Sequence, residues 1–195
     1  MSKINDFETE ELLPVENIRE INNNCNENSY KKHIISVLVC NEFGVLARVA
    51  GLFSGRGYNI ESLSVAETIE PDISKMTIVT SGPDNIIEQI IKQLRKLIPV
   101  LRVSDLTDKE FVAKEMVLIK VKATKSLKED IHRFVDIFRA KIIDVAPESY
   151  IIELTGDSDK VEKFIELMKG IGIMEISKTG IVALQRGKII LEQKK

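Results

Sequence analysis

The chain has 195 residues, of which 44% are hydrophobic and 30% are charged. These proportions are typical of a globular protein, and they exclude a collagen-like, low-complexity or wholly disordered chain. The length suits one domain of ordinary size or two small ones. No apolar stretch is long enough to cross a bilayer, and residues 1–8 do not have the basic start of an export signal. We therefore expect a cytoplasmic protein that makes no use of a membrane.

The net charge of −2 is unevenly distributed along the chain. Residues 1–29 carry seven acidic and two basic side chains, which leaves a net charge of +3 for the remainder. Neither value resembles the strongly basic surface of a nucleic-acid-binding protein, so no nucleic-acid partner is expected. The first thirty residues also contain seven asparagines and few apolar residues. Residues 1–31 are therefore predicted to be a flexible, acidic, Asn-rich tail.

The next part of the chain alternates between strand-like and helix-like patterns. Short β-branched or alternating runs indicate strands, and apolar residues at intervals of three and four indicate amphipathic helices. Glu70-Pro71-Asp72 suits a hairpin turn, and Gly82-Pro83 suits the start of a helix. The expected elements are strands at 34–40, 60–66, 75–80 and 100–106, and helices at 45–53 and 84–97.

The same order of elements then repeats. Ser126 and Glu129 have the spacing of a capping box, and Asp157-Ser158 precedes another apolar helical pattern whose inward face includes Leu167. The expected elements are strands at 117–123, 141–145 and 150–154, helices at 127–138 and 158–168, and a final stretch at 173–184. The pattern predicts an α+β protein with two consecutive ferredoxin-like (βαββαβ) domains, at residues 32–107 and 111–190.

The chain offers little for catalysis. It has no nucleophile elbow, Walker loop, His-Glu-x-x-His motif or Cys-x-x-Cys pair, and Cys25 and Cys40 form neither a disulfide framework nor a metal site. His33 and His132 are expected to be ordinary surface or boundary residues. We therefore predict no catalytic and no metal-binding residues.

The junction between the first strand and the first helix has the groups of a small-ligand site. Gly44 would let a ligand approach the backbone N–H groups of the helix start, which suit a carboxylate, and Asn41 can donate and accept hydrogen bonds. A second asparagine, Asn59, precedes the next strand. Apolar walls would come from neighbouring residues: Val45, Leu46 and Ile60. A plainer alternative is that Gly44 serves a tight turn and Asn41 caps the helix.

A family resemblance bears on that choice. The segments Asn41-Glu42-Phe43-Gly44-Val45-Leu46-Ala47-Arg48-Val49-Ala50-Gly51-Leu52-Phe53-Ser54 and Arg56-Gly57-Tyr58-Asn59-Ile60-Glu61-Ser62-Leu63 resemble the ACT domain of acetolactate synthase (acetohydroxyacid synthase) small subunits. The resemblance covers about residues 32–190, so it includes both predicted domains. Phe43 stands where proline or serine is common in the family.

The resemblance implies a regulatory subunit that holds no cofactor. The large catalytic subunit of that family carries thiamine diphosphate, magnesium and FAD, and the small subunit activates it and makes it sensitive to valine. We expect the first domain, an ACT domain, to form a homodimer with valine or another branched-chain amino acid between two chains. In that arrangement Asn41 and the Gly44 helix start receive the carboxylate, Asn59 orients the polar end, and the isopropyl group lies between apolar side chains: Val45, Leu46 and Ile60. Gln89 matches a family position tied to regulation and is expected to signal to the large subunit.

Other functions remain open on the sequence. The chain could be a stand-alone ACT module that senses an amino acid for a different enzyme or a transcription factor. The strand order also occurs in RNA-recognition domains, but the segments 34–40 and 75–80 lack the aromatic residues on which bases stack. A catalytic function is the least supported.

Overall fold

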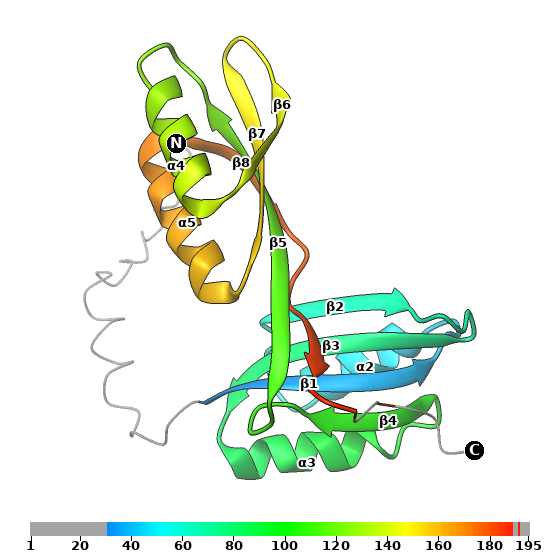
Figure 1. Cartoon of the computed structure of the whole chain (residues 1–195). Coiled ribbons are helices and arrows are strands. Elements are labelled where there is room, and N and C mark those ends of the chain that lie inside the picture. The colour runs from blue at the N-terminus through cyan, green and yellow to red at the C-terminus, as the bar shows by residue number, and fades with distance from the viewer. Residues whose placement is uncertain (1–30, 189–190, 192–195) are drawn as a thin grey trace, which may run out of the picture. The chain divides into compact units, whose positions relative to one another are not determined.

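The computed structural model describes residues 31–188 and Leu191 (Figure 1). The predicted acidic tail at residues 1–31 falls outside the described residues, apart from Lys31, which already belongs to the first strand. Within the described residues no helix is long and apolar enough to cross a membrane.

The first half of the described chain forms an antiparallel sheet with two helices. Its strands lie in the order β2-β3-β1-β4, so β1 and β3 are central and β2 and β4 are the edges. The elements are β1 (Lys31–Cys40), α2 (Val45–Ser54), β2 (Ser62–Glu67), β3 (Ile73–Gly82), α3 (Asp84–Leu94) and β4 (Val100–Asp105).

The second half repeats this order. Its sheet runs β6-β7-β5-β8, and a last strand, β9, pairs with the first residues of β5. The elements are β5 (Phe111–Lys122), α4 (Lys128–Phe138), β6 (Lys141–Val145), β7 (Ser149–Gly156), α5 (Ser158–Ile171), β8 (Ile173–Lys178) and β9 (Val182–Gln185). The predicted α+β class with two ferredoxin-like units is confirmed.

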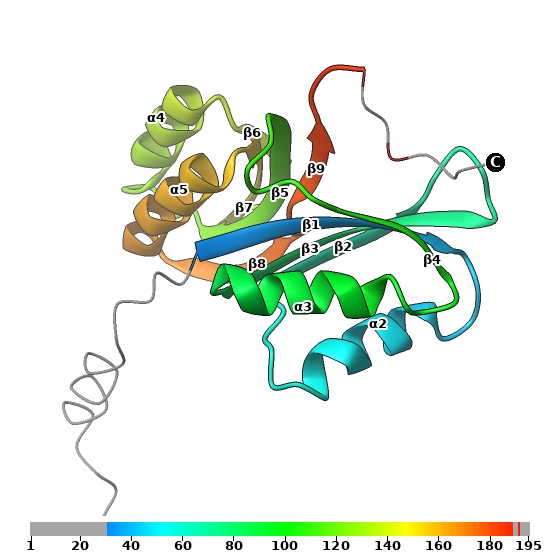
Figure 2. The same ribbon diagram turned by 90° about the horizontal axis from the view of Figure 1, so that it is seen from below.

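Each sheet buries one face under its two helices. On β1 the alternate residues Ile35, Val37 and Val39 point into the first core, where they meet apolar side chains of α2 and α3 such as Phe53 and Leu94. Figure 2 shows both helices on the same side of the first sheet. The second core is built in the same way by β5, β7, α4 and α5. The period of two on the strands and of 3.6 on the helices therefore determines which face each element buries.

Two sequence predictions for the second half are wrong in detail, and the structure divides a third segment into two strands. Ser126 does not cap α4, because the N-cap residue is Leu127 and Ser126 instead lies 3.2 Å from the hydroxyl of Thr124. Leu167 is 40% exposed and not inward-facing. The final stretch is divided into β8 and β9 by a turn at Gly180, which has a φ of 76°.

The turn before β9 brings the two halves of the described chain into contact. Ile181 and Ala183 pack on Val79 and Leu106 of the first half. The backbone N–H of Ile181 also donates a hydrogen bond of 3.1 Å to the Ser62 hydroxyl at the start of β2. Because a Cβ on Gly180 would lie 2.6 Å from that hydroxyl oxygen, the close approach requires glycine.

Replacing Gly180 by alanine should therefore destabilise the protein. The positive φ alone costs about 1–2 kcal/mol for a residue with a Cβ, and the contact with Ser62 adds to that cost. Gly170 provides the matched control, since it lies within α5 with open space around its missing Cβ. Gly170→Ala should stabilise by about 0.5–1 kcal/mol. Denaturant unfolding measures both, and equal effects of the two substitutions would contradict the close packing at Gly180.

Candidate functional site

Gly44 is the residue from which α2 begins. It is the N-cap residue of the helix, with a φ of 79° and no side-chain cap. This left-handed conformation is one that glycine adopts without steric cost, and no atom outside its chain neighbours lies within 4 Å of the position where a Cβ would be. The backbone is thus open to the outside at the point where the helix starts.

Asn41 connects the segment between β1 and α2 to the hairpin formed by β2 and β3. Its side-chain amide nitrogen donates to a carboxylate oxygen of Glu67 at 3.0 Å and to the carbonyl of Pro71 at 2.9 Å. Its backbone N–H donates to the carbonyl of Asp72 at 2.7 Å. Asn41 therefore ties the end of β1 to the end of β2, and the alternative in which it caps α2 is wrong.

The first turn of α2 presents backbone donors. The first N–H groups of any helix lack carbonyl partners inside it. Among the described residues, the N–H groups of Leu46 and Ala47 have no hydrogen-bond acceptor, and the first turn has no acidic side chain. These donors and the positive end of the helix dipole suit a carboxylate.

The two apolar residues of this turn face in opposite directions. The side chain of Leu46 is 44% exposed, whereas that of Val45 is only 6% exposed and packs in the first core. The prediction that both form walls of a ligand site therefore needs correction, because the Val45 side chain serves the core. Only its backbone remains part of the outer surface of the junction.

Asn59 and Ile60 lie at the other end of the same domain. They follow the end of α2 and precede β2, and the carbonyl of Asn59 accepts a hydrogen bond of 2.7 Å from the Thr80 hydroxyl. Ile60 is half-buried against the first core. Thr80 pairs with His33 near the start of β1, whereas Asn41 follows the end of that strand, and the helix α2, roughly 15 Å long, connects the two ends. A single chain therefore does not bring the six predicted contact residues together.

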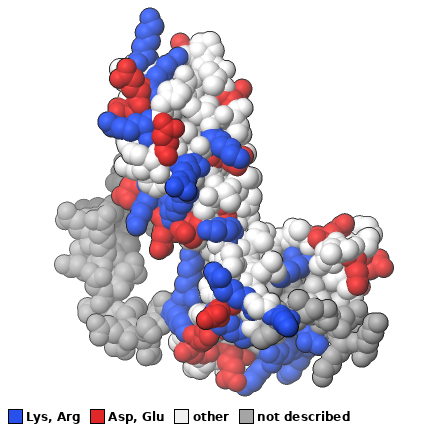
Figure 3. Space-filling model, viewed as in Figure 1, with Lys and Arg blue, Asp and Glu red and all other residues white. Residues whose placement is uncertain are grey.

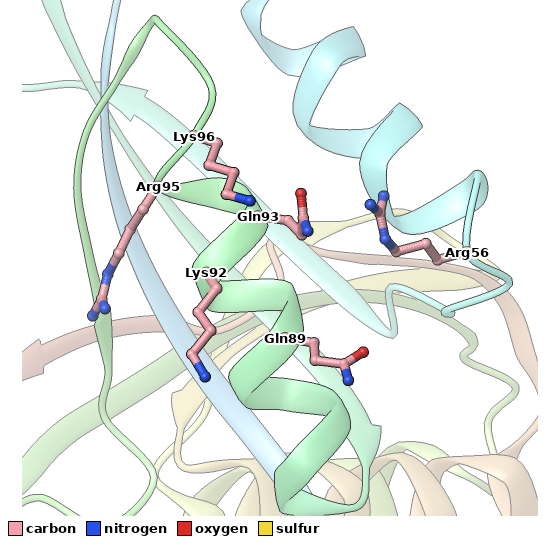
Figure 4. A pocket seen from close by; sticks show the side chains of 6 residues that line it. All are labelled: Arg56, Gln89, Lys92, Gln93, Arg95 and Lys96. Carbon is pink, nitrogen blue, oxygen red and sulfur yellow. The ribbon is translucent and has the colours of Figure 1, made fainter.

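Gln89 lies in a basic hollow on the outer side of α3. Figure 4 shows Arg56, just after α2, lying opposite Gln89 and Gln93 on α3. Lys92, Arg95 and Lys96 complete the lining, and Lys92 forms an ion pair of 2.8 Å with Glu88. The surplus of positive charge in this hollow suits an acidic partner surface better than a small aliphatic ligand.

His33 is a residue whose environment the sequence prediction missed. It is 2% exposed, its Nε2 lies 3.4 Å from a carboxylate oxygen of Asp84, and its Nδ1 lies 3.5 Å from one of Asp105. The alternation along β1 contained the signal, because His33 shares the inward phase of Ile35 and Val37. Its Nδ1 also lies 3.3 Å from the hydroxyl oxygen of Thr107, so His33 belongs to a buried polar cluster at the start of β1.

On the face shown in Figure 3, basic and acidic side chains are interspersed over both halves of the described chain. Within the part of the chain that the structure describes, no three His, Cys, Asp or Glu side chains are grouped to hold a metal ion.

The fold and the junction define a class: an ACT-type domain followed by a second ferredoxin-like domain, with an open helix start beside an edge strand. Family models agree, because residues 35–102 match the ACT domain of acetohydroxyacid synthase (AHAS) small-subunit-like proteins and residues 114–187 match the small subunit of acetolactate synthase. The chain belongs to the acetolactate synthase small-subunit family.

Individual relatives support this membership along most of the chain. The acetolactate synthase small subunit of Aquifex aeolicus is 53% identical over 164 residues, which cover 84% of this chain and 85% of the relative. The small subunit of isozyme 3 from Escherichia coli is 46% identical over 161 residues, covering 82% and 99%. The crystal structure of the Thermotoga maritima small subunit superposes with a TM-score of 0.75 at 44% identity, covering 82% of this chain and 99% of that one.

Proposed function

We propose that this chain is the regulatory subunit of acetolactate synthase in branched-chain amino-acid biosynthesis, activating the large catalytic subunit and making it sensitive to valine. The observation that carries the proposal is the high identity to acetolactate synthase small subunits across both ferredoxin-like units. The catalytic cofactors, thiamine diphosphate, magnesium and FAD, belong to the large subunit in this proposal. This chain contributes binding and a change in the arrangement of subunits.

Two chains assemble side by side through β2. This strand is an edge of the first sheet, and Val65, Ala66 and Glu67 on it are exposed. An edge strand offers unpaired backbone groups to a second strand, and a two-fold axis makes the pairing antiparallel. The start of β2 in one chain then lies beside the end of β2 in its partner.

This pairing brings the two separated parts of the predicted ligand site together, one part from each chain. Asn41 is tied to Glu67 at the end of β2, whereas Asn59 and Ile60 precede its start. Antiparallel pairing of two β2 strands therefore brings the α2 start of one chain toward Asn59 and Ile60 of the other. The N–H groups after Gly44 bind the carboxylate of valine, and Asn59 orients its ammonium end.

The hydrocarbon part of the ligand contacts Leu46 and Ile60. Burial of an isopropyl group contributes only about 1.5–3 kcal/mol, so the shape of the pocket decides between valine and its longer homologues. Because the ligand touches both chains, it favours one relative arrangement of the two first domains. Differential binding of this kind is what transmits an effector signal.

The basic hollow around Gln89 contacts the large subunit. Four cationic side chains surround Gln89, and only Lys92 among them is paired with a carboxylate in the described residues. An acidic segment of the large subunit complements such a surface.

Reconstitution tests the function. The chain is combined with the large subunit from the same cell, and acetolactate formation is measured with and without each branched-chain amino acid. We expect activation by the chain and inhibition by valine. Failure to activate would contradict the proposal, and recovery of a different enzyme in a pull-down would instead support a stand-alone sensing module.

The same assay tests the basic side chains of the hollow around Gln89. The double substitution Arg95→Glu and Lys96→Glu should reduce activation by weakening the complex, while valine binding to the isolated chain stays unchanged. Lys163→Glu, an exposed position on α5, is the matched control. Equal loss of activation in the control and the double variant would contradict the assignment of this surface.

Gly44→Asp should abolish valine binding, whereas activation is largely retained. A carboxylate at the helix start repels the carboxylate of the ligand, and we expect valine affinity to fall by at least about 100-fold in isothermal titration. Gly44→Asn has similar volume and a similar tolerance of the left-handed backbone but no charge, so the loss should be roughly tenfold. Unchanged affinity in the aspartate variant would show that the ligand binds elsewhere.

A further inference from the structure

The face of the first sheet that is turned away from α2 and α3 carries a polar and cationic arrangement. Residues directly opposite each other in an antiparallel sheet share a face. Leu38 of β1 lies between Lys75 of β3 and Arg102 of β4. The Cα atoms of the two basic residues are therefore two strand spacings, or roughly 9–10 Å, apart. Two residues before Leu38 on β1, and therefore on the same face, Ser36 lies between Thr77 and Ser104.

A cavity of about 480 Å³ lies over this part of the sheet. Its polar lining includes Ser36, Lys75, Arg102 and Lys109, and none of the described residues that line it is acidic. Apolar walls come from Leu106 in the first half and from residues in and after β9, namely Leu184 and Leu191. The volume lies within the range of small-molecule sites, and segments from distant parts of the sequence enclose it.

Ser36 is a buried polar group without a partner at this cavity. It is 2% exposed, and its hydroxyl oxygen forms no hydrogen bond within the described residues. Burying an unpaired hydroxyl is unfavourable, and most such groups in folded proteins have a partner. A ligand with oxygen acceptors in the cavity would supply one.

The cations of the cavity have no anionic partners among the described residues. Among the described residues, Lys75, Arg102 and Lys109 form no ion pair with a carboxylate, and Lys109 instead donates to the Ser104 hydroxyl at 2.7 Å. Burial lowers the pKa of the Lys75 ammonium below its ordinary value. Three basic side chains that converge on one cavity, with no counter-charge among the described residues, favour a ligand with several negative charges.

We propose that this cavity binds a small polyanionic metabolite, one that carries phosphoryl groups or several carboxylates. Arg102 offers the planar guanidinium that binds such oxygens in pairs, Lys75 and Lys109 neutralise the remaining charge, and the Ser36 hydroxyl donates the hydrogen bond that it otherwise lacks. The site lies on the opposite face of the sheet from α2, and it does not depend on the valine proposal. Residues of β9 close one side of the cavity, so occupancy also strengthens the attachment of β9 to the first sheet.

Isothermal titration of the full chain with inorganic pyrophosphate, and in a second arm with citrate, tests the proposal. We expect at least one of the two probes to bind. Arg102→Gln and Lys75→Gln should each weaken that binding about tenfold or more, because each removes a charge-assisted contact. Ser36→Ala should weaken it about threefold, and since it removes only a buried, unpartnered hydroxyl, that variant should fold like the wild type.

A control variant distinguishes binding at this cavity from binding at the basic hollow around Gln89. Lys96→Gln alters the hollow around Gln89 and should leave the affinity unchanged. Binding of pyrophosphate alone indicates a phosphoryl ligand, and binding of citrate alone indicates a carboxylate ligand; either supports the site. Absence of binding by both probes, or binding that depends on Lys96 and not on Lys75, Arg102 and Ser36, would overturn the proposal.

Discussion

The first sheet buries only one of its faces under helices, and this constraint shapes the function. Ile35, Val37 and Val39 on β1 are apolar and face α2 and α3, whereas Ser36 between them faces the other side. The inner faces of the helices are committed to the first core, so the edge strand β2, the start of α2, the outer side of α3 and the opposite face of the sheet remain for interactions outside the domain. The regions proposed for subunit pairing, effector binding and anion binding all lie among them.

Local patterns in the sequence were sufficient for most of the fold. The helical spacing of Val45, Val49, Leu52 and Phe53 matches the buried face of α2, and the alternation on β1 matches its two sides. The same spacing also indicates which way the side chains of Val45 and Leu46 face. Residues at i, i+4, i+7 and i+8 share a face, so Val45 belongs to the core and Leu46 to the surface.

Other features depend on contacts between residues far apart in the sequence, which local patterns do not encode. The return of β9 onto the beginning of β5, and the packing of Ile181 against Val79, require the whole chain to have folded. The bonds of Asn41 to Glu67 and Pro71 likewise depend on a hairpin some thirty residues away, which is why helix capping remained an alternative on the sequence alone. The cavity beside Ser36 is likewise not encoded in local patterns, since its walls come from both ends of the described chain.

The contact between Gly180 and Ser62 connects the first half of the described chain to the second half. Ser62 begins β2, the strand proposed to pair two chains, and its hydroxyl accepts the N–H of Ile181 from the second half. In the proposed dimer, a shift of β2 on effector binding would act directly on the turn before β9 through this hydrogen bond. Packed segments of this kind carry coupling when they have more than one stable arrangement.

The most direct measurement asks whether one effector site is built from two chains. Chains with Gly44→Asp and chains with Asn59→Ala, each deficient in valine binding alone, are mixed, allowed to exchange and titrated with valine. A mixed dimer has both defects in one site and none in the other, so about one site in four should regain wild-type affinity. If mixing restores no high-affinity sites although mass spectrometry shows that mixed dimers form, the effector site does not span two chains.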